Sequence, residues 1–232
     1  MSNSDISEFP PVLLECENIE FISFMNTKIK RLPENIGILK NLVSLAVSDS
    51  ELEEVPKSLG QIKNLQYLTL SGNKLTTLPE EMGELSELTR LSLHNNKIYN
   101  LPTTFDNLKK LTHLNLDHNS IFRFPVFILS LSKLESLSLN SNSIKFLPED
   151  ITELHHLKNL SLSFNVIEHL PKNMGHLILL ENLDLKRNRL SELPASMANM
   201  KSLIWLWLKG NTIPSSNLDL LQKKIPKCTI SY

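Results

Sequence analysis

The sequence predicts an α/β solenoid, in which short strands stack into a parallel sheet along one face of a coiled chain. The stretch from Leu157 to Leu179 returns when the chain is shifted by 23 residues in either direction, and self-similarity at a short, fixed period is typical of solenoids. Within each copy, positions 3 to 7 alternate between outward and inward side chains, as in a β-strand. One repeat cannot bury its own apolar face, so we expect stacked neighbours to share one continuous core.

The copies share apolar residues at positions 1, 4, 6, 11, 14, 18 and 21, with Asn at position 9 and Pro at position 15 in the most regular copies. This skeleton, LxxLxLxxNxL followed by LPxx(L/I/M)xxL, resembles the leucine-rich repeat, and in particular the 23-residue LPxxL type of intracellular and bacterial proteins. The resemblance implies a curved right-handed horseshoe with the sheet on the concave face and short helical or 3-10 segments on the convex face. The proline is expected to stop each strand and open such a segment.

The repeats divide the chain into three parts. Residues 1–18 are predicted to be a tail and a degenerate capping half-repeat. Residues 19–214 hold eight full repeats and a ninth partial one, and residues 215–232 form a C-terminal cap. The full repeats begin at Ile19, Leu42, Leu65, Leu88, Leu111, Leu134, Leu157 and Leu180, and the ninth begins at Leu203.

Details of the two caps follow from the same pattern. Cys16 falls on an apolar repeat position, which predicts that it is buried as a small hydrophobic residue. A helix is expected to run to Lys224, with Ser215 or Ser216 as its N-cap. After Pro226, residues 228–232 are expected to extend along the last turn.

Position 9 is expected to carry a structural hydrogen-bonding role. From the third repeat onward it is always Asn, whose amide can satisfy buried backbone groups of the coil. The first two repeats have Thr27 and Ser50 instead. These hydroxyls offer fewer hydrogen bonds, so we expect the first two turns to be the looser end.

Composition excludes several classes of function. The net charge is −1 and the pI is about 6.7, which favours neither nucleic acid nor an anionic membrane as a partner. No Gly-rich phosphate loop, CxxC pair, HExxH or GxSxG motif occurs, so we expect no cofactor, no metal and no catalysis.

The N-terminal sequence and the two cysteines bear on the cellular location of the protein. The N-terminus lacks a secretory signal pattern, and no apolar run is long enough to cross a bilayer. Cys16 and Cys228 are predicted to lie too far apart to form a disulfide, which favours a cytoplasmic location.

One candidate binding site lies near the C-terminus. Equal repeat positions become neighbours in a parallel, in-register sheet, so outward residues of the last repeats should form one cluster. That cluster combines large aromatic side chains with cations, a composition enriched at binding hot spots, and it comprises Trp205, Trp207, Asp184, Lys186, Arg187, Arg189 and Lys209. The alternative is that both tryptophans pack against the C-terminal cap.

A second candidate cluster lies in the middle of the predicted sheet. Its members are Tyr67, Arg90, His94, His113 and Asp117, with His118 beside them. A zinc site would require a tighter ligand spacing, and a Ser92, His113, Asp117 relay would lie on an open sheet without a pocket. We therefore interpret this cluster as a polar contact zone that could respond to pH.

The convex side carries one apolar anomaly. Phe122, Val126, Phe127 and Leu129 replace the polar residues of other repeats, and Tyr99 occupies the position equivalent to Phe122 one repeat earlier. An exposed patch of this kind would be an interface or a dimer contact. The alternative is a longer local helix that folds these residues against their neighbours.

These patterns predict a monomeric scaffold or adaptor that binds a protein partner on its concave face and catalyses nothing itself. The family resemblance implies partners such as small GTPases, kinases or phosphatases, or host proteins for bacterial members. The alternative function is an effector-like or self-associating structural protein that uses the Phe122/Phe127 patch.

Overall fold

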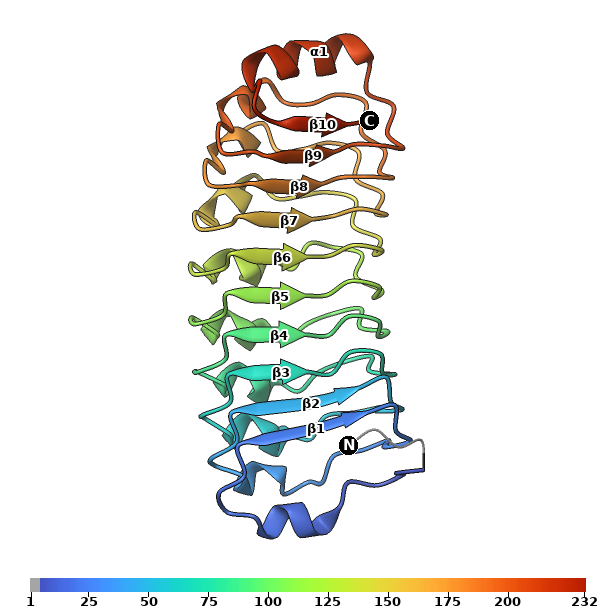
Figure 1. The fold of residues 1–232 in the computed structure, drawn as a ribbon, viewed down its shortest axis with the longest axis vertical. Coiled ribbons are helices and arrows are strands. Elements are labelled where there is room, and N and C mark those ends of the chain that lie inside the picture. Colours follow the sequence, from blue (N-terminus) through green and yellow to red (C-terminus); the bar gives the residue numbers. More distant parts are fainter. Residues whose placement is uncertain (1–4) are drawn as a thin grey trace. The chain divides into compact units, whose positions relative to one another are not determined.

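The computed structural model describes residues 5–232, and their contacts divide the chain into two compact units, with the boundary in the sequence after Ser120. Unit 1 ends at Ser120 and unit 2 runs from Ile121 to Tyr232. Each unit is a stack of coils with its strands side by side in chain order and its 3-10 helices on the opposite side of the coil (Figure 1). The sequence prediction of a solenoid with a parallel sheet is therefore confirmed in both units.

Unit 1 contains five parallel strands. They are β1 (Phe21–Met25), β2 (Ser44–Ser48), β3 (Tyr67–Thr69), β4 (Arg90–Ser92) and β5 (His113–Asn115). The 3-10 helices between and before them are Pro11–Glu15, Ile36–Ile38, Lys57–Gln61, Glu80–Glu84 and Thr103–Asn107.

Unit 2 follows the same plan and ends in an α-helix. Its strands are β6 (Ser136–Ser138), β7 (Asn159–Ser161), β8 (Asn182–Asp184), β9 (Trp205–Trp207) and β10 (Thr229–Ser231). Its 3-10 helices are Val126–Ser130, Glu149–Glu153, Met174–His176 and Ala195–Asn199, and helix α1 spans Ser215–Lys224. The predicted strand length of positions 3 to 7 holds for β1 and β2, whereas strands β3 to β10 have three residues each.

The register places equal repeat positions side by side. In unit 1, Tyr67 pairs with Arg90 and Arg90 with His113. In unit 2, Asn182 pairs with Trp205, and Trp205 pairs with Thr229 of β10. The middle residue of each three-residue strand from β3 to β9 points into the core and is nearly inaccessible, as Leu91 and Leu206 illustrate. Outward residues are thus free to vary without disturbing the core.

Asn at position 9 forms a hydrogen-bonded spine within each unit. Asn188, which is 7% exposed, accepts a hydrogen bond from Ile167 N at 3.0 Å and donates to the carbonyls of Leu162 and Leu185 at 2.9 and 3.1 Å. At the start of unit 1 the smaller hydroxyls pair with each other, because Thr27 Oγ1 and Ser50 Oγ lie 2.8 Å apart. Each spine satisfies backbone groups that the coil would otherwise bury without partners.

The first turn of unit 1 contacts the strand that follows it, but its cysteine is not where the sequence predicts. Lys28 N donates to Ile6 O at 2.7 Å, and Phe9, which is buried, packs edge-on against Phe24 at 5.6 Å between ring centroids. Cys16, in contrast, is exposed. The prediction that it is buried is wrong because the open end of the stack has no preceding coil to cover this position. The predicted tail includes residues 1–4, which lie outside the described residues.

At the end of unit 2, α1 stops at Lys224 as expected, and β10 pairs with β9. The expected N-cap was wrong: Pro214 occupies that position and Ser215 is already helical. Leu218 and Leu221 of α1 are buried, and so is Ile225 at its C-cap. Among residues 5–232, the structure contains no helix that is long and apolar enough to cross a membrane.

Candidate binding surface

The exposed face of strand β9 carries two stacked tryptophans. Because side chains alternate along a strand, Leu206 enters the core while Trp205 and Trp207 point to the opposite face. Their rings are nearly parallel, at 6° with centroids 5.7 Å apart. Trp205 is 42% exposed, and β10 lies beyond β9. Both tryptophans therefore point away from the core, and each lies beside a residue of strand β10 in the predicted C-terminal cap, Trp205 beside Thr229 and Trp207 beside Ser231.

Strand β8 brings one ion pair to these rings. Asp184 pairs in register with Trp207. Lys186 Nζ lies 3.0 Å from Asp184 Oδ2 and 5.8 Å from the centroid of the Trp207 ring. This lysine is held between a carboxylate and an aromatic face, so part of its charge is already compensated.

Three further cations of this region lack an acidic partner. Within the described part of the chain, no carboxylate lies within 4.0 Å of Arg187, Arg189 or Lys209. Elsewhere, lysines form ion pairs with glutamates of the neighbouring repeat, such as Lys110 with Glu87 at 2.6 Å. The C-terminal part of unit 2 thus presents uncompensated positive charge next to exposed aromatic surface. We call Trp205, Trp207, Asp184, Lys186, Arg187 and Lys209 the tryptophan surface.

The structure adds one residue that the sequence interpretation missed. Phe164 is 50% exposed and has φ of 55°, in the left-handed region that costs an L-residue about 1–2 kcal/mol. Arg187 Cζ lies 5.1 Å from the centroid of its ring. The backbone conformation of Phe164 therefore lowers stability, although its side chain does not enter the core.

The repeat pattern held a signal for this residue. Position 8 takes positive φ throughout the described repeats, at Asn26, Asp49, Gly72, Asn95, His118, Ser141, Phe164, Arg187 and Gly210. Asn, Asp, Gly and His are the residues that tolerate this conformation best. A bulky aromatic residue in that column is therefore anomalous.

The mid-sheet cluster belongs to unit 1 and has a different character. Tyr67, Arg90 and His113 follow one another in register on β3, β4 and β5, while His94 and Asp117 occupy position 7. Thr112 Oγ1 lies 2.9 Å from His113 Nδ1. No group of three or more His, Cys, Asp or Glu side chains in residues 5–232 is arranged to hold a metal ion.

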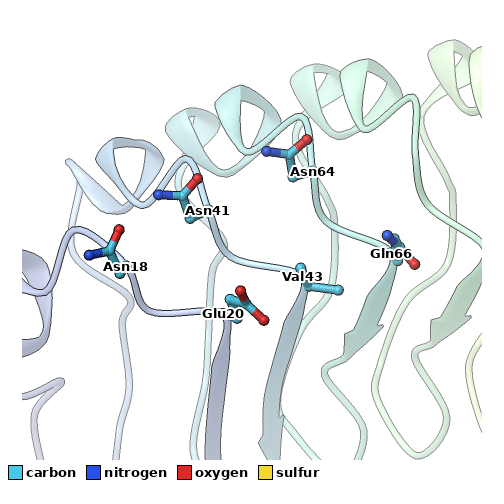
Figure 2. Close-up of a pocket in the computed structure, with 6 residues that line it drawn as sticks. All are labelled: Asn18, Glu20, Asn41, Val43, Asn64 and Gln66. Carbon is cyan, nitrogen blue, oxygen red and sulfur yellow. The ribbon is translucent and has the colours of Figure 1, made fainter.

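Unit 1 also has a polar depression that the sequence did not suggest. It encloses about 390 Å³ and is lined by Asn18, Glu20, Asn41, Val43, Asn64 and Gln66. Figure 2 shows the three asparagine carboxamides in the same orientation. Asn41 Nδ2 donates to Glu17 O and Asn64 Nδ2 to Lys40 O, both at 2.9 Å. These asparagines link successive loops, so their evident role is structural.

The apolar anomaly of the fifth full repeat is partly exposed. Phe122 and Val126 are 54% and 65% exposed, whereas Phe127 and Leu129 are half-buried. The local helix, Val126–Ser130, has five residues, and the equivalent 3-10 helices of the other described repeats have three or five. The alternative of a longer helix is therefore wrong, and Phe122 with Val126 forms a small exposed patch.

Comparison with known proteins identifies the family. The family described as "Leucine-rich repeat region" matches residues 57–149 and 142–223. These ranges cover more than half of the chain, so the chain belongs to the leucine-rich repeat family. A search of curated protein sequences finds no match.

Solved structures of similar fold come from bacteria and plants. A leucine-rich repeat protein of Leptospira interrogans is 29% identical with a TM-score of 0.82, over 98% of this chain and 64% of that one. The structure of PEPR1-AtPEP1 is 29% identical with a TM-score of 0.75, over 85% of this chain and 29% of that one. A plant peptide hormone receptor, RGFR1 in complex with RGF2, is 23% identical with a TM-score of 0.63, over 88% of this chain and 42% of that one. This chain thus spans less than two thirds of the length of each.

Proposed function

We propose that this chain is a protein-binding module, without catalysis of its own, and that its partner docks on the tryptophan surface of unit 2. Leucine-rich repeat proteins typically mediate protein–protein interaction and are generally not enzymes. The similar structures include PEPR1-AtPEP1 and the plant peptide hormone receptor RGFR1 in complex with RGF2. The single observation that carries the proposal is the stacked pair of the exposed Trp205 and the half-buried Trp207 beside cations without acidic partners.

Covering the tryptophan surface with a partner is energetically favourable. Trp and Arg dominate binding hot spots because they combine a large apolar area with directed hydrogen bonds. The rigid strand β9 fixes both rings in advance, so little conformational entropy is lost when a partner covers them. Uncompensated cations would steer an acidic partner to this end of the chain.

The proposal includes a location and a state of assembly. We propose a cytoplasmic location, because the two thiols are free and a reducing compartment suits them. We also propose that the protein is a monomer. A signalling protein such as a small GTPase or a phosphatase, or a host protein, is the kind of partner that the family resemblance implies.

The test compares affinity capture by wild type and two variants. The first variant carries Trp205→Ala, Trp207→Ala and Lys186→Ala; the second, Tyr67→Ala and Arg90→Ala, removes comparable outward residues from unit 1. Every bait must first show the thermal transition of the wild type. We expect a partner that is retained by the second variant and lost by the first, with affinity in direct titration at least about 100-fold weaker for the first. A partner lost only by the second variant would place binding on unit 1 and refute the proposal.

A second candidate function is self-association through the Phe122 patch. Its support is the exposure of Phe122 and Val126 in an otherwise polar part of the repeat. Sedimentation equilibrium of wild type and Phe122→Ser decides it. A concentration-dependent dimer that the substitution dissociates would support self-association, and a strict monomer at every concentration would exclude it.

A further inference from the structure

Arg187 is fixed in place by the two neighbouring repeats. Its guanidinium lies over the Phe164 ring at 5.1 Å. On the other side, a Cβ placed on Gly210 would come within 3.0 Å of Arg187 Cγ, so the arginine stem runs closely over that glycine. Phe164 N donates to Lys186 O and Arg187 N donates to Lys209 O, both at 2.8 Å. The arginine is therefore preorganised on a hydrogen-bonded framework.

An arginine held in this way keeps its hydrogen-bonding edge available. Stacking on an aromatic ring engages the face of the guanidinium, while the N–H donors lie in its plane. Among the described residues, no carboxylate lies within 4.0 Å of Arg187, and neighbouring Lys209 is likewise uncompensated. The planar fork of arginine matches a carboxylate in two parallel hydrogen bonds.

We propose that Arg187, positioned by Phe164 and flanked by Lys209, binds an Asp or Glu side chain of the partner next to the apolar tryptophan pair. This inference rests on the proposed function and narrows it, because it specifies the chemistry of the recognised segment. That segment carries an acidic side chain for Arg187 and, beside it, an apolar side chain for Trp205 and Trp207. Phe164 acts as a positioning residue whose unfavourable backbone conformation is offset by the ordered arginine.

The chain offers a matched control for this arrangement. Arg123 Cζ lies 5.6 Å from the ring of Phe122, so unit 2 contains a second exposed arginine stacked on an exposed phenylalanine, away from the tryptophan surface. Arg123→Gln removes the same charge and the same type of contact as Arg187→Gln. Any effect of net charge or of a lost cation–π contact is therefore common to both variants.

The experiment begins with selection of linear 12-residue peptides from a random phage-displayed library on immobilised wild-type protein. The tightest peptide that requires Trp205 and Trp207 is synthesised, together with a version in which each Asp or Glu is replaced by its amide. Both peptides are titrated against wild type, Arg187→Gln and Arg123→Gln. We expect wild type and Arg123→Gln to prefer the acidic peptide by about tenfold to a hundredfold. Arg187→Gln should bind both versions about equally.

Three outcomes distinguish a failure of the Arg187 proposal from a failure of the proposed function. If the selected peptides require the tryptophans but lack acidic residues, or if Arg187→Gln still prefers the acidic version, the carboxylate site is refuted and the binding surface stands. If no selected peptide depends on the tryptophans, the proposed function itself is refuted, together with this inference.

Phe164→Asn gives an independent readout of positioning. Asparagine suits a φ of 55° better than phenylalanine does. We therefore expect an equal or higher thermal midpoint together with a weaker preference for the acidic peptide. A lower thermal midpoint with an unchanged preference would show that Phe164 serves only the fold.

Discussion

The two units have the same interior and different exteriors. In both, apolar side chains of the strands enter a close-packed core and position 9 supplies hydrogen bonds to the coil. The outward residues of unit 1 around β4 and β5 are small or polar, and several of its lysines, such as Lys63, Lys74 and Lys110, are paired with glutamates. The end of unit 2 instead carries a stacked tryptophan pair, a strained phenylalanine and unpaired cations.

This difference shows which positions of the repeat can carry a specific function. Inward positions are constrained by the stacking of identical coils and repeat almost without change. Outward positions make no contribution to the core and can specialise. A departure from the Ser and Asn background is therefore the feature to search for when function is sought.

The largest expected effect is on the free energy of unfolding, and it comes from substitutions in the hydrogen-bonded spine at position 9. Asn188→Ala in unit 2 removes hydrogen bonds to Ile167 N, Leu162 O and Leu185 O. Buried groups left without partners should lower the free energy of unfolding by about 3 kcal/mol. Ser50→Ala in unit 1 removes fewer bonds and should cost about 1 kcal/mol. Urea denaturation followed by circular dichroism measures both, and equal losses would show that the Asn and Ser spines are equivalent.

A smaller effect should separate paired from unpaired lysines in partner association. Lys209→Gln removes an uncompensated charge beside the tryptophans and should slow association severalfold at low ionic strength, with the difference disappearing in high salt. Lys110→Gln removes a lysine already paired with Glu87 in unit 1 and should leave the rate unchanged. Stopped-flow or surface-based kinetics at two salt concentrations checks this, and equal slowing by the two variants would mean that only net charge matters.

The two thiols should differ in reactivity between the units. Cys16 in unit 1 is exposed, whereas Cys228 in unit 2 is buried. Burial raises the pKa of the Cys228 thiol from 9.0 to about 11. A raised pKa favours the neutral thiol in the folded state, so its contribution to stability is complete below about pH 9 and is lost as the pH rises towards 11. A thiol-reactive dye at pH 8 should modify Cys16 rapidly and Cys228 only after unfolding; rapid modification of both would contradict the burial of Cys228.

The smallest effect concerns surface ion pairs of unit 1. The hydrogen bond from Lys74 lowers the pKa of the Glu51 carboxyl below its ordinary value of 4.5. A lowered pKa favours the ionised carboxylate in the folded state, so its contribution is present above about pH 4.5 and is lost as the pH falls through the lowered pKa. Glu51→Gln should therefore lower the thermal midpoint slightly at pH 7 and not at all at pH 2. A shift of equal size at both pH values would show that the side chain acts through packing.

The sequence predicted the coil and its register, because stacking a fixed period leaves one arrangement in which every leucine is buried. It also predicted that Trp205 and Trp207 lie on the outward face, since strand alternation decides this. The exposure of Cys16 was missed because the open end of a stack does not obey the burial pattern of its interior. Phe164 was missed because backbone conformation, rather than hydrophobic periodicity, makes it unusual, and the stacking of Arg187 on its ring depends on side-chain conformations that a linear pattern does not specify.

Tryptophan fluorescence tests the central proposal most directly, because the chain contains two tryptophans and both lie on the proposed surface. With a partner added at saturation, emission should shift to shorter wavelength and acrylamide quenching should weaken, since a docked partner would exclude water and quencher from Trp205 and Trp207. Binding that leaves both the emission maximum and the quenching constant at their values for the free protein would place the partner elsewhere and contradict the assignment of the tryptophan surface as the binding site.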